Sequence, residues 1–440
     1  MTFLAYPQYK DSGIESLGEI PSHWDVTRLP YVIFENNAGE VIDKNFWGDG
    51  SELLYTCAKQ PLLSDFRDFP ARKRTGANDL LLTRNGTPYV HLPSEGAIYS
   101  NVVQRVSLIP GIDRKFMRSA LDVATRDLVG YGVSIASFNY EMWAALRIPL
   151  PDYEEQTQIA RFLDHETARI DALIEEQQRL IELLKEKRQA VISHAVTKGL
   201  DPTVPMKDSG VEWLGEVPAH WDVKKLKHFG RVVGGFAFKS TDFSSDGHPV
   251  LKISNVGHLC FEWGDQSYLP DEFRESHSEF IAPKGALVFA MTRPVIAGGI
   301  KVARLEDDSL PLVNQRVGFM VIHDLDLSRY VLLSTQSDPF LSQFKNNLTI
   351  TNQPNISSEG IESISIAVPP LIEMKDILAF CLKVDAEVQS LIGDALRGTE
   401  LLQERRSALI SAAVTGKIDV RGWQPPASTQ TPESAVAEVH

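Results

Sequence analysis

The residues whose chemistry first suggests contact with a nucleic acid are polar side chains that follow short apolar segments. Arg84, Asn85 and Thr87 follow the segment DLLLT, and Thr292 and Arg293 lie at the end of ALVFAMTR. An arginine placed where the chain leaves a buried strand can reach a guanine edge or a phosphate. An arginine at a strand end can equally pair with a local carboxylate, so both interpretations stay open.

Two further groups of residues fit phosphate contacts. Arg72, Lys73 and Arg74 form one dense basic run, and Lys224, Lys225 and Lys227 form another. Lys239 and Ser240, which end the segment GGFAFKS, are further candidates for contact with DNA. Solvated charge explains any single one of these cations equally well. The two phenylalanines of GGFAFKS suit a loop with stacking aromatic rings, but we expect at least one of them to be buried.

A weak correspondence links the two groups of strand-end residues. Thr83-Arg84 aligns with Thr292-Arg293, because each arginine stands eight residues after a glycine. The triplet QRV occurs at residues 104–106 and again at 315–317. We therefore predict that the two segments play the same part in two related α+β domains.

A histidine and an aspartate flank a tryptophan in the motif HWD, which occurs twice, at His23 and at His220. A paired histidine and aspartate suit acid–base catalysis. The interpretation that we favour is a turn locked by the packing of Trp24 in one copy and Trp221 in the other.

The elements that must position these residues are duplicated. KDSGIESLGEIPSHWDV at residues 10–26 returns as KDSGVEWLGEVPAHWDV at residues 207–223, with 13 of 17 positions identical. EKRQAVISHAVTKGLD at residues 186–201 matches ERRSALISAAVTGKID at residues 404–419. The segments between these repeats differ in length and sequence. Any duplicated two-domain protein could show this pattern, but a matched frame around divergent inserts indicates one scaffold that presents two different binding domains.

Two long helices are predicted in the matched frame. Residues 154–195 contain no Gly or Pro, and the spacing of their apolar residues is that of a coiled-coil seam. The first seam is predicted at Leu163, Glu166, Ile170, Leu173, Gln177, Leu180, Leu184, Lys187 and Val191. The second is predicted at Cys381, Val384, Val388, Leu391, Ala395, Gly398, Leu402, Arg405 and Leu409. We expect the helices to pair antiparallel with the inserts at opposite ends, and a long helix packed on a globular core is the alternative.

Composition limits the class of protein. The net charge of −14 argues against a simple DNA clamp, but residues 27–148 hold 14 basic against 13 acidic residues, and residues 222–367 hold 14 against 17. Near-neutral inserts of this kind are able to bind DNA through local basic clusters, with help from a partner. Three scattered cysteines, no long apolar run and no signal-peptide pattern predict a cytoplasmic protein without a membrane span.

Catalytic motifs are not found in the sequence. It contains no Asn/Asp-Pro-Pro-aromatic motif of a DNA methyltransferase, no GxxxxGK[ST] loop, and no His/Cys spacing suited to a metal. The rival hypotheses are a fused methyltransferase or nuclease, and a coiled-coil scaffold that never touches DNA. Both are weaker than a non-catalytic DNA-binding protein.

The repeated motifs resemble the conserved regions of type I restriction–modification specificity subunits. The resemblance rests on SGIESLGEIPSHWDVTRL, its copy SGVEWLGEVPAHWDVKKL, the segment IPLPDYEEQTQIARFLD and the segment KRQAVISHAVTKGLD, and it covers residues 9–420. It implies two target-recognition domains, joined by two antiparallel coiled-coil helices with pseudo-twofold duplication. The implied segments are 1–150 and 207–368 for the two domains, 151–206 and 369–420 for the helical regions, and 421–440 for a disordered tail.

The resemblance also implies partners and cofactors. The chain would bind double-stranded DNA, two modification (methyltransferase) subunits and restriction (endonuclease) subunits, and no membrane. It would bind no cofactor itself, while S-adenosylmethionine, ATP and Mg would be bound by the partner subunits.

Overall fold

The structure is a computed structural model that describes residues 4–128, 130–131, 136–264, 266–349 and 352–426. The chain divides into two compact units, Met1–Gln177 with Arg397–His440, and Gln178–Leu396. Each unit combines helices with several small sheets, so the predicted α+β class is confirmed. Each long helix belongs partly to one unit and partly to the other. The domain boundaries predicted from the sequence stay a prediction.

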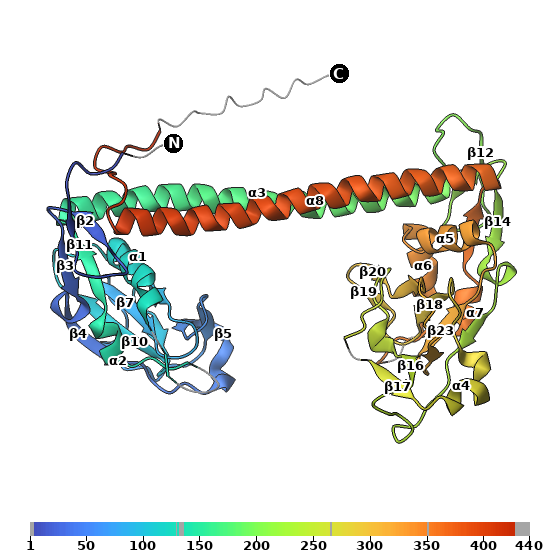
Figure 1. Ribbon diagram of the computed structural model, residues 1–440, viewed down its shortest axis with the longest axis horizontal. Helices are drawn as coiled ribbons and strands as arrows, with labels where there is room; N and C mark the ends of the chain where they lie inside the picture. Colours follow the sequence, from blue (N-terminus) through green and yellow to red (C-terminus); the bar gives the residue numbers. More distant parts are fainter. Residues whose placement is uncertain (1–3, 129, 132–135, 265, 350–351, 427–440) are drawn as a thin grey trace. The chain divides into compact units, whose positions relative to one another are not determined.

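The first unit is built on a four-stranded antiparallel sheet in the order β4-β10-β7-β8 (Figure 1). Every residue of β7 is buried, and its side chains alternate between two cores. Leu80 and Leu82 join the core that contains helix α1, whereas Leu81 joins the smaller core beneath β5 and β9. The strands and helices of the unit are β1 Tyr9–Asp11, β2 Glu19–Pro21, β3 Asp25–Arg28, β4 Ile33–Ala38, β5 Trp47–Tyr55, β6 Leu62–Ser64, β7 Asp79–Thr83, β8 Val90–His91, β9 Ile98–Tyr99, β10 Val103–Leu108, α1 Arg114–Ala124, α2 Tyr140–Ala145 and β11 Arg147–Leu150.

The second unit repeats this plan with the sheet β15-β23-β18-β21. Leu287 and Phe289 of β18 join one core, and Val288 and Ala290 join another, as alternation along a strand requires. Its elements are β12 Met206–Asp208, β13 Glu216–Pro218, β14 Asp222–Lys225, β15 Val232–Gly234, β16 His248–Leu251, β17 Ser267–Leu269, α4 Glu272–Ser276, β18 Leu287–Ala290, β19 Val295–Ile296, β20 Gly299–Ile300, β21 Val302–Arg304, β22 Leu312–Val313, β23 Val317–Met320, α5 Leu325–Ser334, α6 Asp338–Asn346, α7 Ser358–Glu362 and β24 Ser365–Val368.

The apolar segments at residues 79–83, 102–109, 286–291 and 316–322 form β7, β10, β18 and β23, with small differences at the ends. In each unit a glycine lies at the same place, where two segments of the chain pass very close to each other. A Cβ atom on Gly39 would lie 2.2 Å from the carbonyl oxygen of Ser100, and one on Gly235 would lie 2.2 Å from that of Asn314. Only glycine permits so close an approach of two backbones.

Two long helices pass through both units: α3 spans Tyr153–Lys198, and α8 spans Leu371–Val414. In the first unit, the side chain of Gln158 donates to the carbonyl oxygen of Trp423, and Asp171 pairs with Arg406 at 2.8 Å. Gln158 thus meets a residue beyond the end of α8, whereas Asp171, further along α3, meets a residue within α8, so the two segments run antiparallel there. In the second unit, Arg188 pairs with Asp385 at 2.6 Å near the opposite ends of the two helices.

The buried residues of the helices agree with the predicted seams in part. Seven seam residues are buried as predicted, namely Leu163, Glu166, Ile170, Cys381, Val388, Ala395 and Leu409. Three others, Leu173, Leu180 and Leu391, are exposed. The next residue along is more protected in each case, namely Ile174, Ile181 and Ile392. The reason is geometric: a straight α-helix repeats every 3.6 residues, so a strict seven-residue seam drifts around it.

The last described residues of the chain pack against the N-terminal residues of the first unit. Leu4 forms a β-bridge with Asp419, and the Lys417 ammonium donates to the carbonyl oxygen of Glu19 at 2.6 Å. Arg421 stacks over the ring of Tyr6, and Trp423 packs against Phe162 in α3. The predicted disordered tail therefore begins too early at residue 421, because aromatic and cationic side chains hold this segment to the unit. Residues 427–440 lie outside the described residues.

Candidate nucleic-acid interface

The candidate residues of the first unit gather where β7 ends. The Arg84 amide donates to the carbonyl oxygen of Val102 at 2.9 Å, and its guanidinium donates to that of Asn101 at 3.3 Å. Among the residues that the structure describes, Arg84 has no ion-pair partner. Asn85 and Thr87 belong to the same turn, and Thr87 is exposed. The turn thus presents a guanidinium fork, an amide and a hydroxyl, the groups that contact base edges and phosphates.

The second unit does not place Arg293 where the first unit places Arg84. The carbonyl oxygen of Arg84 accepts from the Phe138 amide at 2.7 Å, and the carbonyl oxygen of Met291 accepts from the Ile356 amide at 2.9 Å. Met291 is therefore the structural counterpart of Arg84, and the predicted pairing of Arg84 with Arg293 is wrong by two residues. A shift of two keeps the alternation of a strand, so the residue pattern could not detect it.

The position that matches Arg293 is a glycine. The amide of Gly86 donates to the carbonyl oxygen of Ala136 at 2.8 Å, and the amide of Arg293 donates to that of Pro354 at 2.7 Å. Gly86 and Arg293 also share a positive φ, at 81° and 46°. Arg293 is exposed, and the adjacent Thr292 is buried.

The second predicted alignment, of residues 104–106 with 315–317, is also wrong. Val103 donates to the carbonyl oxygen of Ser100 at 3.0 Å, and Val317 donates to that of Asn314 at 3.2 Å. Val317 thus corresponds to Val103 rather than to Val106. Gln315 stands outside its strand, whereas Gln104 lies within β10.

Two of the three residues in the basic run 72–74 form ion pairs within the first unit. Lys73 pairs with Glu40 at 2.5 Å, and Arg74 binds Glu52 in a bidentate pair with distances of 2.7 and 3.1 Å. The hydrogen bond from Arg74 lowers the pKa of Glu52 and raises that of Arg74 itself. Arg72 alone of the three is exposed without an ion pair among the described residues, so only Arg72 remains well suited to a phosphate contact.

The segment GGFAFKS of the second unit carries Lys239 and Ser240 at its end, and both are exposed. The Lys239 amide donates to the carboxylate of Asp242 at 2.9 Å, which fixes the turn and leaves the ammonium in solvent. Phe238 is buried, as we expected of at least one phenylalanine, whereas Phe236 is 38% exposed. Phe236 rests on a cluster of aromatic rings formed by Phe238, Phe273, His277 and Phe280.

The first HWD motif links the N-terminal repeat to helix α3 through hydrogen bonds. Trp24 is fully buried, and its indole N–H donates to Glu155 in the first turn of α3 at 3.0 Å. His23 lies 2.9 Å from the same carboxylate, and the Tyr6 hydroxyl donates to it at 2.6 Å. The carboxylate that contacts the histidine thus comes from Glu155 rather than from Asp25. Burial and this acidic neighbour raise the pKa of Tyr6, which keeps its hydroxyl a donor.

The second motif makes the same tie. The indole N–H of Trp221 donates to Glu373 at 3.0 Å, and His220 lies 2.8 Å from that carboxylate. The structural interpretation of HWD is therefore correct. Glu155 and Glu373 are 218 residues apart, as are the matched segments 186–201 and 404–419, and this equal spacing was the signal in the sequence for their shared role.

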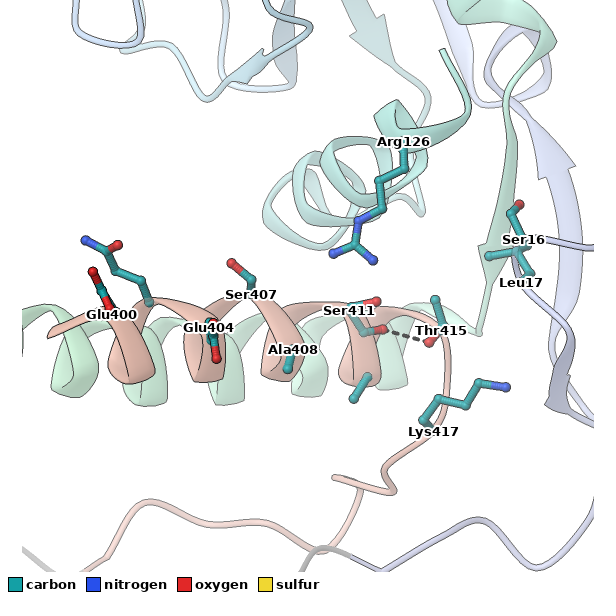
Figure 2. Close-up of a pocket in the computed structure, with 12 residues that line it drawn as sticks. Ser16, Leu17, Arg126, Glu400, Glu404, Ser407, Ala408, Ser411, Thr415 and Lys417 are labelled. Atoms are coloured by element: carbon teal, nitrogen blue, oxygen red, sulfur yellow. Dashed lines mark hydrogen bonds between the residues drawn. The ribbon is translucent and has the colours of Figure 1, made fainter. Parts of the chain in front are cut away.

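The first unit also carries an open groove of about 840 Å³ along the end of α8 (Figure 2). Arg126 extends from beyond α1 towards Ser407 and Ser411 of the helix. The groove is lined by Ser16, Leu17, Arg126, Glu400, Gln403, Glu404, Ser407, Ala408, Ser411, Ala412, Thr415 and Lys417. Its floor consists of short side chains, which suits contact with another surface.

The equivalent face of α3 in the second unit is covered by its own chain. The carboxamide of Gln189 donates to the carbonyl oxygen of Gln336, and the Asp338 amide donates to the Ser193 hydroxyl at 3.2 Å. Ser193 is buried, whereas Ser411, its counterpart in the repeat, is half-buried. Helix α6, which starts at Asp338, follows directly. The two units thus differ in how much of the helix surface they leave open.

The described residues contain neither a candidate metal site nor a candidate membrane span. No three His, Cys, Asp or Glu side chains among them gather to hold a metal ion. Within the same residues, no helix is both long and apolar enough to cross a membrane.

Comparison with known proteins agrees with the fold and the repeats. Residues 218–393 match the family described as type I restriction modification DNA specificity domain. The chain is 26% identical to the type I restriction enzyme MjaVIII specificity subunit of Methanocaldococcus jannaschii, over 94% of this chain and 97% of that protein. It is 25% identical to the EcoKI specificity subunit of Escherichia coli, over 66% of this chain and 62% of that protein.

A solved structure shares the fold. A chain from a study of complex assembly and conformational transition of the type I R-M system superposes with a TM-score of 0.65 and 15% identity, over 90% of this chain and 98% of that chain. The duplicated frame, the mixed fold of each unit and the similarity along nearly the whole length of a curated relative lead to one conclusion. Over nearly its whole length the chain is similar to the DNA specificity subunits of type I restriction–modification enzymes, and residues 218–393 match the DNA specificity domain of that family.

Proposed function

We propose that each unit reads one half of a bipartite double-stranded DNA site. The observation that carries this proposal is that one backbone scaffold presents different side chains at equal positions. Arg84 of the first unit is replaced by Met291, and Gly86 is replaced by Arg293. A constant scaffold with changed contact residues is what two different half-sites require, because base edges are distinguished by the donors and acceptors that meet them.

The two long helices would set the distance between the half-sites. Under this proposal, α3 and α8 form one antiparallel coiled coil, related by a pseudo-twofold axis, with the reading units at its opposite ends. The ion pairs Asp171–Arg406 and Arg188–Asp385 support an antiparallel arrangement within each unit. A rigid frame would hold the unread spacer at a fixed length, with half-site centres about one helical turn of DNA apart.

The same helices would bind two modification subunits. Five leucines of α8 are more than half exposed, namely Leu371 at 52%, Leu382 at 73%, Leu391 at 51%, Leu396 at 51% and Leu401 at 65%. Exposed apolar residues on a helix favour a protein partner. In the first unit, the groove beside Ser407 and Ser411 would add to this contact. The partner would supply S-adenosylmethionine, and restriction subunits would supply ATP hydrolysis and Mg-dependent cleavage. The assembled enzyme would act in the cytoplasm, where its DNA lies.

The decisive experiment exchanges one insert. The chain is expressed with its modification subunit in a host that lacks other methyltransferases, and the methylated site is determined by sequencing. Replacing residues 27–148 with the equivalent insert of a relative should change one half of the site and leave the other half unchanged. The proposal fails if both halves change, or if the wild-type complex methylates no bipartite site.

A further inference from the structure

Three cations meet at one end of the central sheet of the second unit. Arg293 follows β18, Arg316 precedes β23, and Lys301 precedes β21. The segment around Arg293 is hydrogen-bonded to both other cations: the Met291 amide donates to the carbonyl oxygen of Arg316 at 2.7 Å, and the Lys301 amide donates to that of Pro294 at 2.7 Å. The three residues therefore lie on neighbouring segments of one surface.

These cations are not neutralised by the protein. Arg293 and Arg316 are exposed, Lys301 is half-buried, and none of the three has an ion-pair partner among the residues that the structure describes. The other end of the same strands shows the contrast. There Lys284 pairs with Asp308 at 2.9 Å, and Arg304 pairs with Glu306. In a unit with an excess of acidic residues, the sheet end beside Arg293 is a local site of positive charge.

The backbone at both arginines adopts a conformation that favours glycine. The φ angle is 46° at Arg293 and 72° at Arg316, and only Leu259 and Leu310 share this feature among the described non-glycine residues. The first unit has Gly86 at the position of Arg293, with the same left-handed backbone. An arginine there costs conformational energy that glycine does not, and such residues concentrate at functional sites.

The equal positions in the first unit carry no donor side chain. Arg316 matches Val102, since the amides of Met291 and of Arg84 donate to these two carbonyl oxygens. The guanidinium groups are therefore features of the second unit alone. Two planar forks at one sheet end match the paired O6 and N7 acceptors that guanine presents in the major groove.

We propose that Arg293 and Arg316 are specificity-determining residues that read guanine in the half-site bound by the second unit. This inference rests on the proposed function and names the contacts that carry it out. The first unit lacks these forks and would read its half-site through other residues, among them Arg84. The two halves of the site would then differ in sequence.

The test uses the full chain assembled with its modification subunit. Methylation rates are measured on duplexes that carry the recognised site and every single-base change in each half. The variants are Arg293→Gly, Arg316→Gly and Arg316→Lys, and Lys284→Ala at the opposite sheet end is the control. Glycine removes the fork and suits the backbone, so the thermal midpoint should stay equal or rise.

We expect each glycine variant to lower kcat/KM on the recognised site about tenfold or more, and to lose discrimination at guanine positions of one half-site only. Arg316→Lys keeps the charge but not the fork, so it should lose the same discrimination. The control should behave as the wild type. Equal weakening on all duplexes would assign the arginines to phosphates and overturn the inference, as would unchanged discrimination or a lower thermal midpoint. A wild-type complex that methylates no bipartite site would instead refute the proposed function.

Discussion

The indole N–H of Trp24 donates to the carboxylate of Glu155 at 3.0 Å, which ties the N-terminal repeat to the first turn of α3. Trp221 makes the same bond to Glu373. The two ties differ in burial, because the Glu155 side chain is 4% exposed and that of Glu373 is 27% exposed.

This difference predicts unequal costs of removing the carboxylate. Glu155→Ala leaves two buried donors, the Tyr6 hydroxyl and the Trp24 indole, without an acceptor and should lower the free energy of unfolding of the first unit by about 3–5 kcal/mol. Glu373→Ala should cost the second unit about 1–2 kcal/mol. Urea unfolding of the full chain, with the exposed neighbour Glu154→Ala as control, measures both. Equal losses in the two variants would contradict the argument from burial.

The pH dependence of the first unit should contain a contribution from His91. Burial, with a smaller effect of Arg118, lowers the pKa of His91 to about 4, while its ring lies 3.0 Å from the carbonyl oxygen of Thr56. The unfolded chain takes up this proton near pH 6.5, so the stabilisation is present above pH 6.5 and is lost as the pH falls to 4. The loss should amount to about 3 kcal/mol. His91→Gln keeps an N–H donor without the titration, and its stability should therefore change less between pH 7 and pH 4. Equal changes in the two proteins would exclude His91 as a cause.

Arg84 and Arg74 should respond differently to replacement by alanine. Arg84 lacks an ion pair, so Arg84→Ala should weaken specific DNA binding by the assembled complex by about 1–3 kcal/mol and leave assembly intact. Arg74 is held by Glu52, so Arg74→Ala should lower stability by about 1 kcal/mol and leave DNA affinity unchanged. Fluorescence anisotropy and thermal unfolding separate the two effects. Unchanged affinity and methylation in Arg84→Ala would assign that residue to a structural role.

The length of the helices should set the length of the unread spacer. Four residues added after Gln177 and after Ala395 insert one helical turn of about 5.4 Å into each long helix. One base-pair step is about 3.4 Å, so the tolerated spacer should lengthen by about one or two base pairs with both half-sites unchanged. Sequencing of methylated DNA provides the measurement. If the lengthened protein still recognised a site with the original spacer, the helices would not set the spacer length.

The partner should supply most of the affinity for DNA. The chain carries a net charge of −14, and phosphate binding needs cations. The purified chain should therefore bind its site weakly at physiological salt, and addition of the modification subunit should tighten binding strongly. Titration of labelled duplex with and without the partner tests this. Tight binding by the isolated chain would remove the need for the partner.

The segment around Trp423 should contribute to the stability of the first unit. Trp423→Ala removes contacts with Phe162 and His165 and should cost about 1–3 kcal/mol. Gln424→Ala, at the exposed neighbouring position, is the matched control and should leave the free energy of unfolding unchanged. An equal effect of the two changes would show that Trp423 does not anchor the segment.

The sequence predicted the frame well because duplication supplies its own alignment. The helix expected at residues 154–195 is α3, Tyr153–Lys198, and the two HWD turns are locked by Trp24 and Trp221 as expected. The burial seam was misplaced near Leu173, because a heptad template ignores the 3.6-residue period.

The correspondence between the two inserts is hidden by their differences in length and sequence. When the alignment of two strands is shifted by two residues, the same face stays apolar, because side chains alternate along a strand. The residue pattern therefore did not reveal that Arg84 matches Met291. The left-handed backbone shared by Gly86 and Arg293 leaves no mark that a single sequence reveals. The internal pairs of Lys73 and Arg74 depend on Glu40 and Glu52, whose approach is decided by the folded sheet.

The closure of the first unit by Asp419 and Lys417 has a consequence for synthesis on the ribosome. The first unit contains the earliest residues of the chain, yet its β-bridge to Leu4 and its packing around Trp423 require the last described ones. The second unit is one continuous stretch, Gln178–Leu396, and is complete in the nascent chain before them. The half that emerges first is therefore the half that is finished last, and its N-terminal repeat has no α8 to lie against until residues 371–417 have emerged.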